Sequence, residues 1–179
     1  MTDANLHDFV AGPVIVNDYS ARDVQIPQTQ FYKGKSFRTF GPVGPYLCML
    51  GAGDMGALKD FRLTLTVNGE VRQSDSTRNL VYGPAETLTE LSGVHDLHPA
   101  TSSRPARRLA PAGCALAIPS PTMQRLGGLL PDRVKWDFFT SAQAKRTQYL
   151  KAGDVVEARI KSADGAIDLG VQRNRVVEG

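Results

Sequence analysis

The stretch FRLTLTVNGEVRQ, residues 61–73, constrains the fold of this chain more than any other. Apolar side chains from Leu63 to Val67 alternate with polar ones, which is the period of a strand with one buried face. Asn68 and Gly69 then supply the two positive-φ residues of a two-residue turn. The stretch therefore predicts a β-hairpin.

Other segments predict more strands and one short helix. Residues 14–17 form a short apolar run, and residues 153–160 and 166–172 indicate two strands joined by the turn SADG. In GPAETLTELSG, Pro84 suits the start of a helix, and Gly93 can adopt a left-handed end. Residues 32–47, GPVGP among them, predict a long structured loop because glycine and proline punctuate the backbone. The chain is therefore predicted to be strand-rich, of the α+β class.

The totals place the chain among ordinary globular proteins. Its 179 residues are 41% hydrophobic and 22% charged, which suits a single domain over residues 1–179. There is no apolar run long enough to span a membrane, and MTDANLHDFV has no secretory pattern, so we expect a cytoplasmic protein. Cys48 and Cys114 share no zinc-ligand spacing and suit free thiols in a reducing compartment.

A formal net charge of +3 raises the question of a nucleic-acid partner. Three of the positive charges, Arg104, Arg107 and Arg108, fall in one short stretch. Aromatic residues do not interleave them as a stacking platform for bases requires. We therefore expect no nucleic-acid partner and no membrane partner.

Polar side chains that could line an active site follow the first apolar run, in VNDYSARDVQ. Asp18 is a candidate ligand for a hard cation such as Mg²⁺ or Ca²⁺, since a strand end holds its carboxylate rigidly. Arg22 and Gln25 follow at helical spacing, where they could bind a substrate carboxylate and a carbonyl or enolate oxygen. Lys35 could place an ammonium beside a developing oxyanion. The alternatives are a local ion pair for Asp18 and Arg22, and a solvated loop lysine for Lys35.

These motifs resemble a known family when they are taken in order. NDYSARDVQ, GKSFRTFGPVGP, LTLTVNGEVRQ with ETLTELSG, and YLKAGDVVEARI ending in GVQRNRVV resemble the C-terminal catalytic domain of the fumarylacetoacetate hydrolase family. The resemblance runs from about Val14 to Val177, and its first two motifs are the specific ones.

The resemblance implies a mixed β-roll with short helices, a homodimer, and Mg²⁺, Mn²⁺ or Ca²⁺ as cofactor. It implies a β-diketo or 2-oxo acid substrate that is cleaved by water at a C–C bond. Isomerisation, hydration and decarboxylation are alternatives, because all proceed through a metal-stabilised enolate. By position, Asp18 matches the metal ligand and Lys35 the catalytic lysine. Arg22 and Gln25 match substrate contacts, and Thr39 matches the residue that orders a water or a second ion.

The chain departs from the family at its start. The family also uses a Glu-x-Glu pair upstream of this aspartate, whereas residues 1–17 contain no glutamate, and His7 lies in no matching motif. A hard divalent ion takes about six oxygen ligands, so the metal site is expected to be incomplete. We expect an N-terminally truncated chain with impaired activity, or a non-catalytic remnant that dimerises.

A second departure lies in LHPATSSRPARRLAPAGCALA, residues 97–117, where the family has a strand of the type PGDLVATGTP. Suppose that Pro99–Arg108 are encoded by G/C-rich codons, and that each new codon takes the last base of one codon and the first two bases of the next. The regrouped codons then spell Gly-Asp-Leu-Val-Ala-Thr-Gly-Thr-Pro. The hypothesis is a local frameshift over Ala100 to about Ala110, which would take the formal net charge from +3 to −1. The alternative is a genuine basic surface loop. Under the frameshift, we expect a marginally folded chain or one that needs a partner copy.

The segment after residue 117 is longer than the usual family connection. Trp136, Phe138 and Phe139 could cap the substrate pocket or pack as a short helix, on which Lys145 and Arg146 would be solvated.

Overall fold

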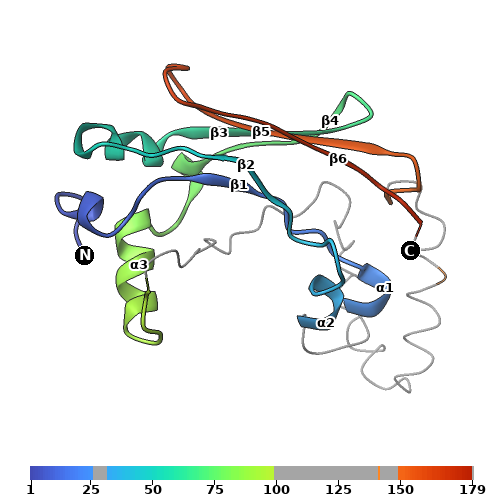
Figure 1. The fold of residues 1–179 in the computed structure, drawn as a ribbon, viewed down its shortest axis with the longest axis horizontal. Helices are drawn as coiled ribbons and strands as arrows, with labels where there is room; N and C mark the ends of the chain where they lie inside the picture. The colour runs from blue at the N-terminus through green and yellow to red at the C-terminus, as the bar shows by residue number, and fades with distance from the viewer. Residues whose placement is uncertain (26–31, 99–140, 142–148, 179) are drawn as a thin grey trace, which may run out of the picture. The chain divides into compact units, whose positions relative to one another are not determined.

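The computed structural model describes residues 1–25, 32–98, 141 and 149–178 (Figure 1). The described residues divide into two compact units, one with residues 1–17, 42–98 and 152–178, the other with residues 18–25, 32–41, 141 and 149–151. The first unit holds the short helices η1 (Leu6–Asp8), η2 (Ala52–Lys59), η3 (Thr77–Asn79) and α3 (Pro84–Ser92), and the strands β1 (Val14–Val16), β2 (Val43–Leu47), β3 (Phe61–Val67), β4 (Glu70–Ser76), β5 (Val155–Ser162) and β6 (Asp168–Arg175). The second unit holds α1 (Arg22–Gln25) and α2 (Tyr32–Lys35).

An antiparallel four-stranded sheet in the order β4-β3-β5-β6 dominates the first unit (Figure 1). The predicted hairpin is confirmed, because β3 turns into β4 through Asn68 at φ 52° and Gly69 at φ 84°. The other edge of β3 pairs with β5 in unbroken register from Phe61 opposite Ser162 to Val67 opposite Val156. The strands predicted over residues 153–160 and 166–172 are β5 and β6, so the strand-rich α+β class is confirmed.

One face of this sheet is covered by β1. Ile15, Phe61, Ala158 and Leu169 form a buried cluster, and both Ile15 and Leu169 are almost fully enclosed. These residues come from β1, β3, β5 and β6, so the alternation read from the sequence points their apolar side chains to one side. The predicted strand at residues 14–17 is thereby confirmed as a core strand.

A buried glutamine joins β6 to the two-stranded sheet formed by β1 and β2. The Gln172 side-chain amide donates to the carbonyl oxygens of Ile15 at 3.4 Å, Pro42 at 3.1 Å and Gly44 at 3.0 Å. Its own carbonyl oxygen accepts from Asn174 Nδ2 at 3.2 Å. Since a buried amide is costly without partners, this arrangement ties three segments together at one side chain.

Helix α3 begins as predicted, with Pro84 in its first turn and the Glu86 carboxylate accepting from the Gly83 N–H at 3.4 Å. The predicted left-handed end at Gly93 is wrong, because Gly93 has φ −76° and ψ −15°. The last turn tightens instead: the Gly93 and Val94 N–H groups donate to carbonyls three residues back. Those bonds satisfy the terminal carbonyls, so a left-handed residue is not needed.

The loop predicted over residues 32–47 is wrong at both of its ends. Its first residues form the single turn of α2, and its last form β2, which contains Pro45. A proline fits there because β2 pairs with β1 alone and most of its residues are exposed.

Several sequence-based expectations fall on residues outside the described ones: the hypothesised frameshift over Ala100 to about Ala110, Cys114, the aromatics Trp136, Phe138 and Phe139, and the pair Lys145 and Arg146. Within the described residues, no helix combines the length and apolar character that a membrane crossing needs.

Candidate functional site

All five predicted site residues fall in the second unit, around α1 and α2. Each helix is a single turn, and the Ala21 N–H, just before α1, donates to the Gly34 carbonyl of α2 at 2.8 Å. One-turn helices are unstable alone, so their mutual contact is what holds them.

Asp18 and Lys35 are brought together. The Lys35 ammonium at the end of α2 donates to Asp18 Oδ2 in an ion pair between side chains that are 33% and 45% exposed. Lys35 therefore lies in a one-turn helix and not in a loop, and its partly exposed ammonium has a carboxylate partner. The role predicted for Asp18 as a metal ligand meets direct competition from this ammonium.

Arg22 and Gln25 are also brought together, at the two ends of α1. Arg22 Nη1 donates to Gln25 Oε1, and the Gln25 side chain is 4% exposed. An amide that accepts through its oxygen presents its NH₂ group as the donor, and a guanidinium carries five N–H groups. The pair can therefore offer donors to an anionic or carbonyl-bearing ligand while Gln25 is fixed by burial. The alternative pairing of Arg22 with Asp18 is not the one formed, because Asp18 pairs with Lys35.

Thr39 lies in a turn four residues after Lys35. The Phe40 N–H donates to the Phe37 carbonyl at 3.0 Å, and Thr39, at the third position of this turn, has φ 75°. That position normally takes glycine, and a β-branched residue there is strained. Such strain persists only where the surroundings impose it, and it often marks functional sites.

Aromatic contacts beside this turn were missed by the sequence analysis. Tyr19 packs edge-on against Phe40 at 6.2 Å between ring centroids, and Phe37 packs against Phe40 at 5.6 Å. These rings join the residue after Asp18 to the turn that carries Thr39. The aromatic residues between Tyr19 and Phe40 were the available signal, but which of them come into contact depends on how the chain folds back.

The described residues do not fit a divalent cation. Asp18 is held by Lys35, and the described part of the chain contains no group of three or more His, Cys, Asp or Glu side chains that could hold an ion. A hard cation requires about six oxygen ligands. The expected Mg²⁺, Mn²⁺ or Ca²⁺ therefore has no supporting ligand set here.

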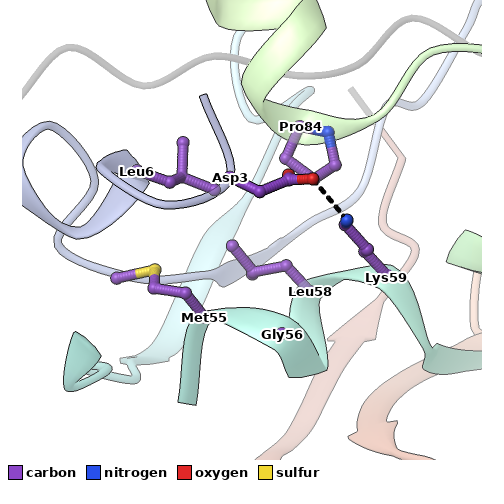
Figure 2. A pocket seen from close by; sticks show the side chains of 7 residues that line it. All are labelled: Asp3, Leu6, Met55, Gly56, Leu58, Lys59 and Pro84. Atoms are coloured by element: carbon purple, nitrogen blue, oxygen red, sulfur yellow. Dashed lines mark hydrogen bonds and ion pairs between the residues drawn. The ribbon is translucent and has the colours of Figure 1, made fainter. Parts of the chain in front are cut away.

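A separate pocket in the first unit contains none of the predicted site residues (Figure 2). Leu6, Met55 and Leu58 line it, and a 2.5 Å ion pair from Lys59 to Asp3 closes one side. Leu6 and Met55 also belong to a second buried cluster with Ala85. We interpret this pocket as a gap in a small apolar core.

Comparison with known proteins decides the family. A model of the family described as fumarylacetoacetate (FAA) hydrolase, C-terminal, matches residues 1–101, more than half of the chain. The chain belongs to this family. The match includes both specific motifs of the sequence, and it ends at residue 101, one residue after Ala100, where the hypothesised frameshift begins.

Relatives within the fumarylacetoacetate hydrolase family carry different names. The chain is 33% identical over 130 residues to a Burkholderia lata protein named "Putative hydrolase", covering 72% of this chain and 44% of that one. The fold of this chain is similar to that of a probable 2-hydroxyhepta-2,4-diene-1,7-dioate isomerase from Mycobacterium abscessus, with 28% identity and a TM-score of 0.64. The similarity covers 100% of this chain and 54% of the isomerase. A fumarylacetoacetate hydrolase from Exiguobacterium antarcticum gives 25% identity, a TM-score of 0.61, and coverage of 100% and 51%. The chain therefore spans about half, or less, of these family members.

Proposed function

We propose that this chain carries the substrate-binding part of an enzyme of the fumarylacetoacetate hydrolase family that cleaves a β-diketo or 2-oxo acid with water. The observation that supports this proposal is the gathering of two cations and one buried amide in the second unit. Arg22, Gln25 and Lys35 all lie on two one-turn helices that contact each other.

The chemistry of each side chain suits such a substrate. Arg22 binds the substrate carboxylate through its guanidinium fork. The Gln25 NH₂ group donates to a carbonyl oxygen and orients it. The Lys35 ammonium stabilises the negative charge that develops on oxygen when the C–C bond breaks.

The reaction balances without a further reactant. Water adds to one carbonyl, the bond between that carbon and its neighbour breaks, and the electron pair passes into the enolate of the departing 2-oxo acid. A proton from the added water passes to the neighbouring carbon, the one that left with the electron pair, so a β-diketo acid and water give a carboxylic acid and a 2-oxo acid. Lys35 exchanges its partner from the Asp18 carboxylate to the enolate oxygen during the step.

The test is the release of pyruvate from acetylpyruvate, a simple β-diketo acid, by the whole chain. Lys35→Met is expected to lower kcat by about 100-fold or more, as the loss of an oxyanion-stabilising donor does elsewhere. Lys33→Met is the matched control, because Lys33 is exposed on the same helix. Equal rates for the wild type and Lys35→Met, or a wild-type rate no higher than the uncatalysed one, would contradict the proposal.

An isomerase of the same family is a second candidate, favoured by the structural similarity to the probable isomerase from Mycobacterium abscessus. It would shift a double bond through the same enolate and would form no new carboxylic acid. Product analysis by NMR of a 2-hydroxydienoate incubated with the chain separates it from a hydrolase.

A non-catalytic remnant that dimerises is the third candidate, favoured by the unsuitable ligand set around Asp18. Exposed apolar side chains on and beside β2, Val43, Tyr46, Leu47 and Met49, offer a surface for a second copy. Sedimentation of a chain without turnover, measured against a Tyr46→Lys variant, tests this candidate.

A further inference from the structure

Gly34, between Lys33 and Lys35 in α2, lies where α1 and α2 touch. A Cβ built on Gly34 would lie 2.7 Å from Gln25 Cβ, 2.9 Å from Gln25 Cα and 3.0 Å from Gln25 N. Two of these atoms are backbone, so they cannot rotate away as a side-chain tip can. The backbones of the two helices therefore approach as closely as only a glycine permits.

Hydrogen bonds beside this contact lock the same approach. The Gly34 carbonyl accepts from the Ala21 N–H at 2.8 Å, and the Ala21 carbonyl accepts from the Gln25 N–H at 2.8 Å. Gly34 and Gln25 are both buried, in contrast to Lys33. At this contact α1 and α2 are therefore held together by backbone groups of both helices and of Ala21.

We propose that Gly34 is a positioning residue that sets Lys35 beside Asp18 by letting α2 dock on α1. Lys35 follows Gly34 directly in the chain, and Asp18 lies three residues before Ala21, the hydrogen-bond partner of Gly34. Any separation of the two helices at Gly34 therefore also separates the Lys35 ammonium from the Asp18 carboxylate. The catalytic meaning of this inference rests on the proposed function, whereas the docking itself can be measured in a chain without turnover.

An alanine at residue 34 is expected to move α2 until its Cβ reaches ordinary contact with Gln25. Misplacement of a reacting group by about 1 Å can cost about 100-fold in rate, so Gly34→Ala should lower kcat without a matching rise in KM. Gly53→Ala is the matched control: Gly53 also lies in a short helix, η2, and a Cβ there would meet nothing within 4 Å.

The deciding measurement is the acetylation rate of Lys35 relative to Lys33, read by mass spectrometry after brief treatment of the whole chain with acetic anhydride. Loss of an ion pair to Asp18 should raise this ratio by about two- to fivefold in Gly34→Ala and leave it unchanged in Gly53→Ala. Asp18→Asn should raise it as well, and adding Gly34→Ala to Asp18→Asn should raise it no further. A purely structural role would predict a further rise in that double variant.

An unchanged ratio in Gly34→Ala, or an equal rise in the presence and absence of the Asp18 carboxylate, would overturn the inference. If Gly34→Ala does not fold, amide hydrogen exchange in the wild type is the deciding measurement. The inference predicts that the Ala21 N–H, bonded to the Gly34 carbonyl, exchanges as slowly as the Gln25 N–H. Exchange of Ala21 at the rate of an unfolded chain would overturn it. Absence of turnover in the wild type would contradict the proposed function alone, since the acetylation ratio and the exchange rates do not depend on turnover.

Discussion

Thr39 shows how much a single residue can reveal about a site. Its φ of 75° is unfavourable for a β-branched side chain by about 1–2 kcal/mol, which exceeds the entropy of about 0.5–1 kcal/mol that a glycine would lose on folding. Thr39→Gly should therefore stabilise the chain by about 0.5–1 kcal/mol in urea unfolding. If Thr39 serves the site, the same variant should lower turnover.

The matched control is Thr64→Gly in β3, where threonine is exposed in an ordinary strand. It should destabilise the chain by about 0.5–1 kcal/mol, because glycine is entropically costly within a strand. Equal destabilisation by both substitutions would show that the conformation of Thr39 is not strained.

Gln172 offers a sharper test, because its amide faces three carbonyl oxygens. Gln172→Glu keeps the shape but turns a donor towards three acceptors into another acceptor, so it should cost about 3 kcal/mol or more. Gln172→Met removes the donor without adding an acceptor and should cost less. Urea unfolding measures the stability of both variants. A Gln172→Glu variant as stable as the wild type would show that the hydrogen bonds of this amide do not stabilise the fold.

The strand pair β5–β6 contains an ion pair, Arg159 with Asp168, whose contribution to stability should depend on pH. A hydrogen bond from Arg159 holds the pKa of Asp168 below its usual range, with Nε to Oδ2 at 3.2 Å. A lowered pKa in the folded chain means that this carboxylate contributes stability at neutral pH and loses that contribution as the pH falls below about 4. Asp168→Asn should therefore be less stable than the wild type at pH 7, and the gap should close in acid.

Melting temperatures between pH 7 and pH 3 measure this gap. Asp96→Asn, exposed beyond α3, serves as the control and should leave the profile unchanged. A gap that stays constant down to pH 3 would mean that Asp168 acts through its shape and not through its charge.

At the scale of elements, periodicity predicted more than composition did. Alternation over residues 61–67 and the Asn68-Gly69 turn predicted β3 and β4 because both rules are local. The Gly- and Pro-rich stretch over residues 32–47 misled, because β2 is held by its pairing with β1 and by Gln172, a residue 125 or more positions further on. Four candidate site residues were proposed by type and spacing and Thr39 by the family resemblance alone, whereas the Asp18–Lys35 pair depends on how α2 meets α1.

At the scale of the whole molecule, the family match ends at residue 101, just where the sequence departs from the expected family strand. We propose that the stretch from Ala100 to about Ala110 is read in a shifted frame. The nucleotide sequence of the gene should then spell Gly-Asp-Leu-Val-Ala-Thr-Gly-Thr-Pro in the alternative frame, and a gene without that frame would end the proposal.

A chain with those nine residues restored should be more stable. Burial of one leucine and one valine contributes about 1.5–3 kcal/mol each, which corresponds to a rise in melting temperature of about 6–24 °C for a chain of this size. The control is a chain with the same nine residues in scrambled order. No rise over that control would favour a genuine basic loop.

The pairing of β3 has a consequence for the order in which the sheet can form while the chain is being synthesised. Its β4 edge can pair as soon as residue 76 has been synthesised, whereas its β5 edge must wait for residues 155–162, some 80 positions later. The entropy of closing a long loop grows only slowly with its length, so changes in the length of the intervening segment scarcely alter the free energy of closing the sheet. They act instead on the time during which a nascent hairpin stands with one edge unpaired.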